Sequence, residues 1–213
     1  MIITFDGPSG SGKSTLAKKV SKKLKVMHID SGSIYRTIAY YLIKNNIDLE
    51  DAKDKVKDIC ISYNKYGVSL DGKHLKDELR TADVTNMSSV IATKRYVREK
   101  VNSIIRQTAY EYSVIVDGRD IGTAVLPNAD YKFYIDASAS TRARRRYNQL
   151  KRKDMLNGKS YQEILLDIEA RDKRDKERDI DPLAIPENAI IINTSNKKIN
   201  DTIDEILSHI QGV

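Results

Sequence analysis

Short apolar runs alternate along this chain with longer stretches in which apolar residues recur every three or four positions. The short runs have the pattern of buried strands and lie at residues 2–5, 26–30, 113–118, 131–138 and 189–193. The longer stretches have the spacing of one helix face. Because strands that alternate with helices favour a parallel sheet, the pattern predicts an α/β fold with helices on both faces of the sheet.

Apolar stripes mark four of the expected helices. Each stripe spaces its apolar residues so that they share one face of a helix. The stripes are Leu16, Val20 and Leu24; Ile34, Ile38 and Leu42; Tyr161, Ile164, Leu165 and Ile168; and Ile199, Ile203, Ile206 and Ile210.

One region interrupts this rhythm. Residues 67–75, GVSLDGKHL, give two short strand patterns on either side of Asp71-Gly72, a dipeptide that favours a two-residue hairpin turn. We therefore expect residues 62–92 to form a small insertion in the α/β fold.

The most specific motif lies between the first strand and the first helix. Residues 7–14, GPSGSGKS, match G-x-x-x-x-G-K-S in the strand-to-helix context that a phosphate-binding loop requires. Glycines let the backbone wrap closely, so that its N–H groups point at phosphate oxygens, and the start of the next helix adds positive charge. Lys13 can reach the outer phosphates, and the Ser14 hydroxyl can bind Mg²⁺.

An ordinary glycine-rich turn is the alternative interpretation, but the fixed positions and both flanks favour the phosphate site. We therefore predict that this segment holds a nucleoside triphosphate. The expected residues are Gly7, Pro8, Ser9, Gly10, Ser11, Gly12, Lys13, Ser14 and Thr15.

Composition narrows the class of protein without deciding it. The chain has 213 residues, 40% of them hydrophobic, which favours one compact domain with a core. No apolar run approaches the ~18 residues of a membrane helix, and we recognise no signal peptide, so we expect no membrane association. The single cysteine, Cys60, excludes an internal disulfide and suits the cytoplasm. The net charge of +7 favours an anionic partner, namely nucleic acid, a membrane surface or nucleotide phosphates.

Two charged residues follow the strand at 113–118. Asp117 ends an apolar run, so we expect its carboxylate near the phosphate loop, where an aspartate binds Mg²⁺ directly or through water. Arg119 lies two residues later and is expected to point to the same place. The alternative is an aspartate that only caps the loop after the strand.

A basic helix is expected from residue 142 onward. Ala143, Tyr147 and Leu150 form its apolar face, whereas Arg144 and Lys151 are expected in solvent. Near the end of the preceding strand, three arginines could reach phosphate: Arg142, Arg145 and Arg146. A nuclear-localisation or nucleic-acid patch is the alternative.

A second charged segment begins at residue 169. Arg171, Arg174, Asp175 and Arg178 fall at i, i+3, i+4 and i+7, so we expect them on one face of a helix. Arginine offers a planar fork that binds phosphate through two parallel hydrogen bonds. A surface face of ion pairs is the alternative. The sequence contains no Ser-His-Asp or Cys-His arrangement, and phosphoryl transfer needs none, since positioning, Mg²⁺ and arginines stabilise its transition state.

Six segments, taken in order, resemble the bacterial cytidylate kinases. They are FDGPSGSGKST, IDSGSIYR, RTADVTNMSSVIATKRYVRE, VDGRDIGT, RARRRYNQL and EARDKRDKERDIDPL. The resemblance covers essentially the whole chain and implies a P-loop nucleoside monophosphate kinase fold with a five-stranded parallel sheet. It implies one kinase domain over residues 1–213. Its core would comprise residues 1–30, 110–146 and 179–213, its monophosphate-binding region residues 31–109, and its lid residues 147–160.

The resemblance also implies the reaction, which is transfer of the ATP γ-phosphate to CMP or dCMP with Mg²⁺ held by Ser14 and Asp117. Around the acceptor nucleotide, the resemblance implies roles for Asp117 and for four residues near the acceptor phosphate, namely Ser31, Arg36, Arg119 and Arg178. It matches Arg171 and Asp175 at the ribose, and Ser89, Arg98 and Asp120 at cytosine. It matches Arg142 and Arg146 as arginines that flank the lid. The implied catalytic set is Lys13, Arg119, Arg178, Arg171, Arg142 and Arg146.

Other functions remain open from the residues alone. A kinase for UMP, dTMP or shikimate would share the phosphate loop, but cytosine presents an N4 amine that a carboxylate or hydroxyl can accept, where uracil presents an acceptor. A nucleotide-gated switch or an RNA-binding P-loop protein would explain the net charge of +7. We expect ATP and CMP or dCMP as partners, no stable nucleic-acid complex, and a monomer.

Overall fold

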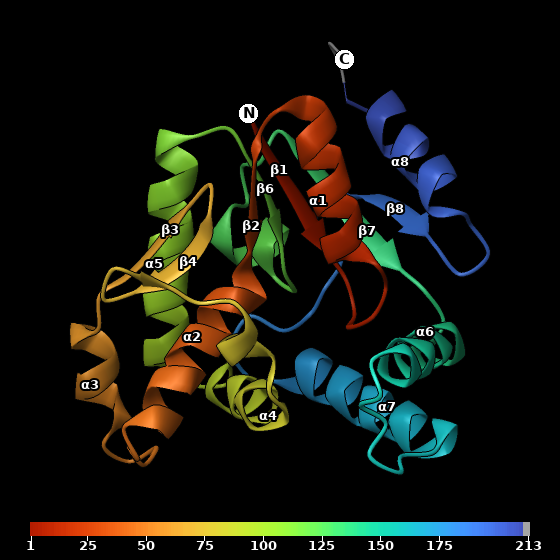
Figure 1. The fold of residues 1–213 in the computed structure, drawn as a ribbon. Helices are drawn as coiled ribbons and strands as arrows, with labels where there is room; N and C mark the ends of the chain where they lie inside the picture. The colour runs from red at the N-terminus through yellow and green to blue at the C-terminus, as the bar shows by residue number, and fades with distance from the viewer. Residues whose placement is uncertain (211–213) are drawn as a thin grey trace.

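The computed structural model describes residues 1–210, and a five-stranded parallel sheet runs through the middle of the molecule (Figure 1). Its strands are β1 (Ile2–Asp6), β2 (Met27–Asp30), β6 (Val114–Asp117), β7 (Tyr131–Asp136) and β8 (Ile190–Asn193), in the order β2-β6-β1-β7-β8. All neighbouring strands are parallel, and Phe5 of β1 pairs with Asp117 of β6. The five strands and the α/β fold class predicted from the sequence are confirmed.

Helices cover both faces of the sheet. On one face, α1 (Lys13–Leu24) and α8 (Ile199–Ser208) pack against the strands, and on the other α2 (Ser31–Lys44) and α5 (Arg95–Glu111) do so. In β6, Ile115 packs into the α1–α8 layer, whereas Val114 and Val116 pack into the α2–α5 layer. Because alternate side chains of β6 enter different layers, residues 114–116 are all apolar.

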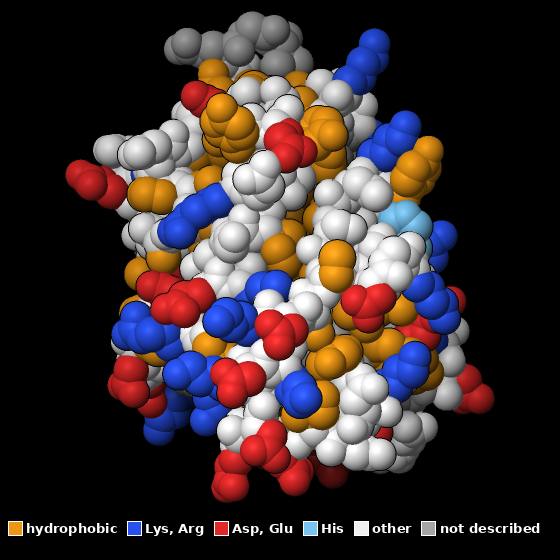
Figure 2. All heavy atoms as spheres, turned by 90° about the vertical axis from the view of Figure 1, so that its left-hand side faces the viewer, with side chains coloured by type: hydrophobic (Ala, Val, Ile, Leu, Met, Phe, Trp, Pro, Cys, Tyr) orange, Lys and Arg blue, Asp and Glu red, His pale blue; other side chains and the backbone are white. Residues whose placement is uncertain are grey.

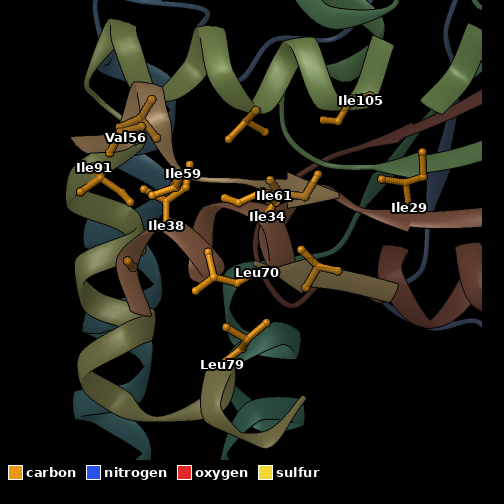
Figure 3. Close-up of a cluster of buried hydrophobic side chains, with 14 of the residues drawn as sticks. Ile29, Ile34, Ile38, Val56, Ile59, Ile61, Leu70, Leu79, Ile91 and Ile105 are labelled. Atoms are coloured by element: carbon orange, nitrogen blue, oxygen red, sulfur yellow. The ribbon is translucent and has the colours of Figure 1, made fainter. Parts of the chain in front are cut away.

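The larger core lies between the sheet and the predicted insertion. In Figure 3, Ile34 and Ile38 of α2 lie beside Ile61 and Leu70 of a small antiparallel sheet. That sheet consists of β3 (Ile61–Asn64), β4 (Gly67–Leu70) and β5 (Lys73–His74). Packing against the small sheet therefore buries the α2 stripe that the sequence predicts.

The hairpin predicted in this region is confirmed. Leu70 pairs with Lys73 across the turn, and Asp71 and Gly72 have φ of +49° and +78°, as a two-residue turn of this kind requires. The third strand of the small sheet, β3, is not predicted from the sequence pattern. The same is true of α3 (Ala52–Asp58), the 3₁₀ turn at Asp77–Arg80, α4 (Ala82–Ile91) and α5.

Two further helices lie beneath the carboxyl ends of the strands in the view of Figure 1. They are α6 (Ala139–Arg152) and α7 (Tyr161–Glu177), which pack together through Ala143, Ile164 and Ile168. One expectation is wrong here. Because the backbone at Arg178 is extended, with φ −66° and ψ 143°, α7 ends one residue before it. Arg178 therefore does not continue the helix face of Arg171 and Asp175.

The surface is mixed in charge. On the face in Figure 2, basic and acidic side chains are interspersed rather than separated into patches. The apolar stripe of α8 is buried except at Ile199, which is 38% exposed. Within residues 1–210, every helix is too short or too polar to cross a membrane.

Candidate active site

The phosphate-loop motif lies between the carboxyl end of β1 and the first turn of α1, as the sequence predicts. Gly7, Gly10 and Gly12 have φ of +141°, +81° and +96°, values that side chains rarely adopt. A Cβ atom on Gly7 would lie 2.1 Å from the carbonyl oxygen of Ile135, so only glycine fits where the loop passes β7. The loop therefore wraps at the end of the sheet where such folds bind ligands.

Lys13 begins α1 and is buried beside this loop. Its Nζ donates a hydrogen bond of 2.9 Å to the carbonyl oxygen of Pro8. Burial lowers the pKa of Lys13 well below its ordinary value, and the charge of Arg119 lowers it further, while Asp117 opposes the shift. A bound anion would counter both effects, because an opposite charge favours the protonated lysine.

Ser14 and Asp117 meet directly, since Ser14 Oγ donates to Asp117 Oδ2 at 2.5 Å. The other carboxylate oxygen, Oδ1, lies 2.5 Å from Nε2 of His28 in β2. Burial raises the pKa of Asp117, but the hydrogen bonds from His28 and Ser14, together with nearby positive charge that includes Lys13, hold that pKa below its ordinary value.

Hydroxyl and carboxylate oxygens are ligands that Mg²⁺ prefers, so Ser14 and Asp117 fit that cation. In the described chain, no three or more His, Cys, Asp or Glu side chains cluster as a metal site. Mg²⁺ characteristically takes most of its ligands from water and phosphates, so a site with few protein ligands also suits it.

Two arginines and an aspartate lie close to Lys13. Arg119 Nε donates to Asp175 Oδ2 at 2.9 Å. Arg171 comes from α7, and its Nε is buried without a hydrogen-bond partner. Burial, with the charge of Arg119, lowers the pKa of Arg171 to about 10. Burial raises the pKa of Asp175, but Arg119 and Arg171 outweigh it and lower that pKa.

A second cluster surrounds Asp120. It joins Arg98 and Asp120, which are expected at the cytosine base, to Arg178, which is expected at the acceptor phosphate. Arg98 Nη2 and Arg178 Nη2 donate to opposite oxygens of Asp120, the second over 2.9 Å. Arg98 Nε also donates to Asp181 Oδ2 at 2.9 Å, and Arg178 Nε donates to the Asp181 carbonyl oxygen at 2.7 Å. Arg178 thus hydrogen-bonds within the group around Asp120, whereas Arg119 hydrogen-bonds to Asp175.

The start of α2 adds further expected acceptor residues. Ser31 Oγ donates to the carbonyl oxygen of Asp117 at 2.7 Å, and Arg36 Nη2 donates to Asp30 Oδ2 at 2.7 Å. The backbone N–H of Asp30 donates to the hydroxyl oxygen of Tyr63 in β3, at 3.0 Å. Ser89 is half-buried on α4, which packs against α2.

The two expected lid-flanking arginines differ. Arg142 is buried and donates to both carboxylate oxygens of Asp172, at 3.0 and 2.5 Å, and to the carbonyl oxygen of Ser9 at 3.1 Å. It therefore connects the phosphate loop to α7. Arg146 is exposed and donates to Gln149 Oε1.

Known proteins match this chain along its whole length. The family model described as cytidylate kinase matches residues 3–212. A cytidylate kinase from Clostridium botulinum (strain Loch Maree / Type A3) is 41% identical over 98% of this chain and 97% of its own length. The chain belongs to the cytidylate kinase family. A relative from Fervidobacterium nodosum with the same name is 41% identical over 96% of this chain and 94% of its own.

The fold of this cytidylate kinase family member is also similar to that of solved structures with low sequence identity. A shikimate kinase from Bacteroides thetaiotaomicron has a TM-score of 0.51 at 13% identity, covering 98% of this chain and 97% of its own. An uncharacterized protein from Eubacterium ventriosum has a TM-score of 0.57 at 14% identity, covering 100% and 99%. At these identities the likeness shows the fold alone.

Four residues that contact the candidate active site were not predicted from the sequence. They are Asp6, His28, Asp172 and Asp181. Asp6 is fully buried and accepts hydrogen bonds from the backbone N–H groups of Ile121 and Gly122, at 2.8 and 2.7 Å. Burial raises the pKa of Asp6 to about 7, although these two hydrogen bonds oppose the shift. Asp6 therefore ties the end of β1 to the short π-helical segment Ile121–Val125, which follows Asp120.

Proposed function

We propose that this protein transfers the γ-phosphate of ATP to CMP or dCMP, giving ADP with CDP or dCDP. The observation that carries the proposal is the cluster of Lys13, Arg119 and Arg171 beside the phosphate loop. Burial and the charge of Arg119 lower the pKa values of Lys13 and Arg171, and the buried Nε–H of Arg171 has no hydrogen-bond partner. Membership of the cytidylate kinase family supports the choice of nucleotides.

The donor half of the site would hold the phosphates of ATP through the backbone of residues 7–15. Lys13 would contact the outer phosphates in place of the Pro8 carbonyl oxygen that it contacts here. Ser14 and Asp117 would hold Mg²⁺, which when bound neutralises charge that develops on the phosphate oxygens.

The acceptor half would hold the monophosphate. Ser31, Arg36, Arg119 and Arg178 would lie near its phosphate, and Arg171 with Asp175 near its ribose. The unpartnered Nε of Arg171 supports an acceptor oxygen nearby, since a buried donor without a partner is costly.

Ser89, Arg98 and Asp120 would select cytosine. The carboxylate of Asp120 is held on both sides by guanidinium groups, which fixes its direction. An acceptor fixed in this way favours a base with an N4 amine over one with a carbonyl oxygen at that position.

Transfer would be direct, without a covalent enzyme intermediate. An oxygen of the acceptor phosphate forms the new bond to the γ-phosphorus, while the bond from that phosphorus to the β–γ bridging oxygen breaks and ADP leaves. Lys13, Arg119 and Arg171 stabilise the charge on the transferred group. Residues 147–160 would act as a lid that excludes water from the site. The kinase core would comprise residues 1–30, 110–146 and 179–213, and the monophosphate-binding region residues 31–109.

A panel of acceptors tests the proposal. ADP release from MgATP is measured with CMP, dCMP, UMP, AMP, dTMP and shikimate, and the protein's mass in solution tests the proposed monomer. We expect kcat/KM for CMP or dCMP to exceed the others by at least roughly fivefold, the low end of the cost of one mismatched buried polar group. A better acceptor outside this pair, or ADP release that no acceptor accelerates, would overturn the proposal. The second result would favour a nucleotide-gated switch.

A further inference from the structure

His28 lies beside the phosphate site without belonging to any of its expected groups. It sits in β2, opposite Ile115 of β6, so that Asp117 is its diagonal neighbour two residues further along β6. Residues two apart on a strand point to the same face of the sheet, so Asp117 lies on the same face as Ile115. The imidazole is mostly buried, with 17% of the side chain exposed, and its Nε2 lies 2.5 Å from Asp117 Oδ1.

The two oxygens of Asp117 have separate partners. Ser14 contacts Oδ2 and His28 contacts Oδ1. An ionised carboxylate only accepts hydrogen bonds, so His28 must donate to it through Nε2–H. The histidine therefore fixes the plane of the carboxylate from the side opposite to Ser14, and leaves the oxygen beside Ser14 available to a cation.

We propose that His28 is a positioning residue for the metal–phosphate site, holding Asp117 so that its Oδ2 stays beside Ser14. The inference rests on the proposed function, because it takes Ser14 and Asp117 as the residues that hold Mg²⁺. Residues that orient a metal ligand through a hydrogen bond typically change metal affinity by ~10- to 100-fold when they are removed.

Three variants separate the hydrogen bond from the bulk of the ring. His28→Leu removes the N–H donor and leaves an apolar side chain of similar size. His28→Gln keeps an N–H donor that can reach about as far toward Asp117. His74→Leu is the matched control, because this exposed histidine of β5 hydrogen-bonds to Ser69 in the insertion. Thermal unfolding establishes that each variant is folded.

Mn²⁺ serves as the probe, and its electron paramagnetic resonance signal measures the free ion in the presence of enzyme and ADP, without acceptor and hence without turnover. We expect the Kd for Mn²⁺ to rise at least ~10-fold in His28→Leu, and to stay within roughly threefold of wild type in His28→Gln and His74→Leu. ADP affinity measured in EDTA should not change.

An unchanged or tighter Kd for Mn²⁺ in His28→Leu would overturn the proposal, and so would an equal loss in His28→Gln. If His28→Leu does not fold, His28→Asn takes its place, since the shorter amide does not reach Asp117. The acceptor panel on the wild-type protein tests the proposed function separately. A wild type that binds Mn²⁺ with ADP but does not phosphorylate CMP refutes that function while leaving the role of His28 to the binding data.

Discussion

The donor and acceptor halves of this site are built in opposite ways. The phosphate loop of the donor half comes from one continuous segment, residues 7–15, in which the chain turns from β1 into α1. The acceptor half is assembled from α2, α4, α5, the turn after β6 and the end of α7. Arg98 of this half donates a hydrogen bond to Asp181, a residue 83 positions away.

The electrostatics of the two halves differ as well. Around the phosphate loop, burial lowers the pKa values of Lys13 and Arg171, and the buried Nε of Arg171 has no hydrogen-bond partner. Around Asp120, the guanidinium groups of Arg98 and Arg178 already have carboxylate or carbonyl partners. The cations beside the phosphate loop thus favour a bound anion, whereas the group around Asp120 is arranged in advance. We therefore expect the loss of Lys13 to lower the rate most, and the loss of Asp120 to change selectivity and stability.

The largest effect should come from the donor half. Lys13→Ala removes the cation that reaches the outer phosphates, so kcat should fall more than tenfold, a loss of over ~1.4 kcal/mol of transition-state stabilisation. Lys18→Ala, exposed on the same helix, is the control and should keep wild-type kcat. A folded Lys13→Ala variant that retains more than about a tenth of wild-type kcat would contradict the rate-controlling role of this half.

Asp120→Ala tests selectivity in the acceptor half. Losing the acceptor for the N4 amine should lower kcat/KM for CMP far more than for UMP. One buried polar group is worth roughly 5- to 150-fold, so the CMP/UMP ratio of kcat/KM should fall by at least about fivefold. The variant should also unfold more easily, since breaking a buried ion pair costs ~3–5 kcal/mol. Kinetics with both nucleotides and urea unfolding measure the two effects. An unchanged CMP/UMP ratio would remove Asp120 from base recognition.

The same contrast explains what the sequence could predict. The phosphate loop is local, since its glycines, its lysine and the helix stripe of Leu16 and Val20 stand within fourteen consecutive residues, 7–20. The parallel strands are mostly apolar because both faces of the sheet are covered, so they too were predicted. Helix α5 was predictable but not predicted, since Val97, Val101 and Ile105 form a regular stripe that is fully buried.

Other features left no local signal. Strand β3 has only Ile61 and Tyr63 as apolar residues, and its pairing with β4 defines it as a strand. Asp172 lies outside the i, i+3, i+4 set on α7, and its partner Arg142 is 30 residues away. The resemblance to the cytidylate kinases supplied Arg98 and Asp120, but the hydrogen bonds from Arg98 and Arg178 to Asp120 required the structure.

Substitutions of Asp175 and Arg178 separate sugar recognition from phosphate recognition within the acceptor half. If Asp175 accepts from the ribose 2′-hydroxyl, Asp175→Ala should lower the CMP/dCMP ratio of kcat/KM by roughly two- to tenfold, the worth of one hydrogen bond. Arg178→Ala should lower kcat for all acceptors and leave that ratio unchanged. Because Arg178 hydrogen-bonds to Asp120, the CMP/UMP ratio is measured in the same variant. A change confined to the CMP/UMP ratio would assign Arg178 to the base rather than to the phosphate.

The smallest effect concerns the insertion, whose small sheet contacts the acceptor half through the hydrogen bond from the Asp30 backbone to Tyr63. Tyr63→Phe keeps the ring and removes this acceptor, at a cost of ~0.5–1.5 kcal/mol. Asp30 precedes Ser31 and holds Arg36, so the loss should appear as a roughly two- to tenfold rise in KM for CMP, with KM for ATP unchanged. Tyr66→Phe, on the same hairpin and 69% exposed, is the matched control. Equal rises in both KM values would mean that the insertion supports the whole site, and the separation of donor and acceptor halves would fail.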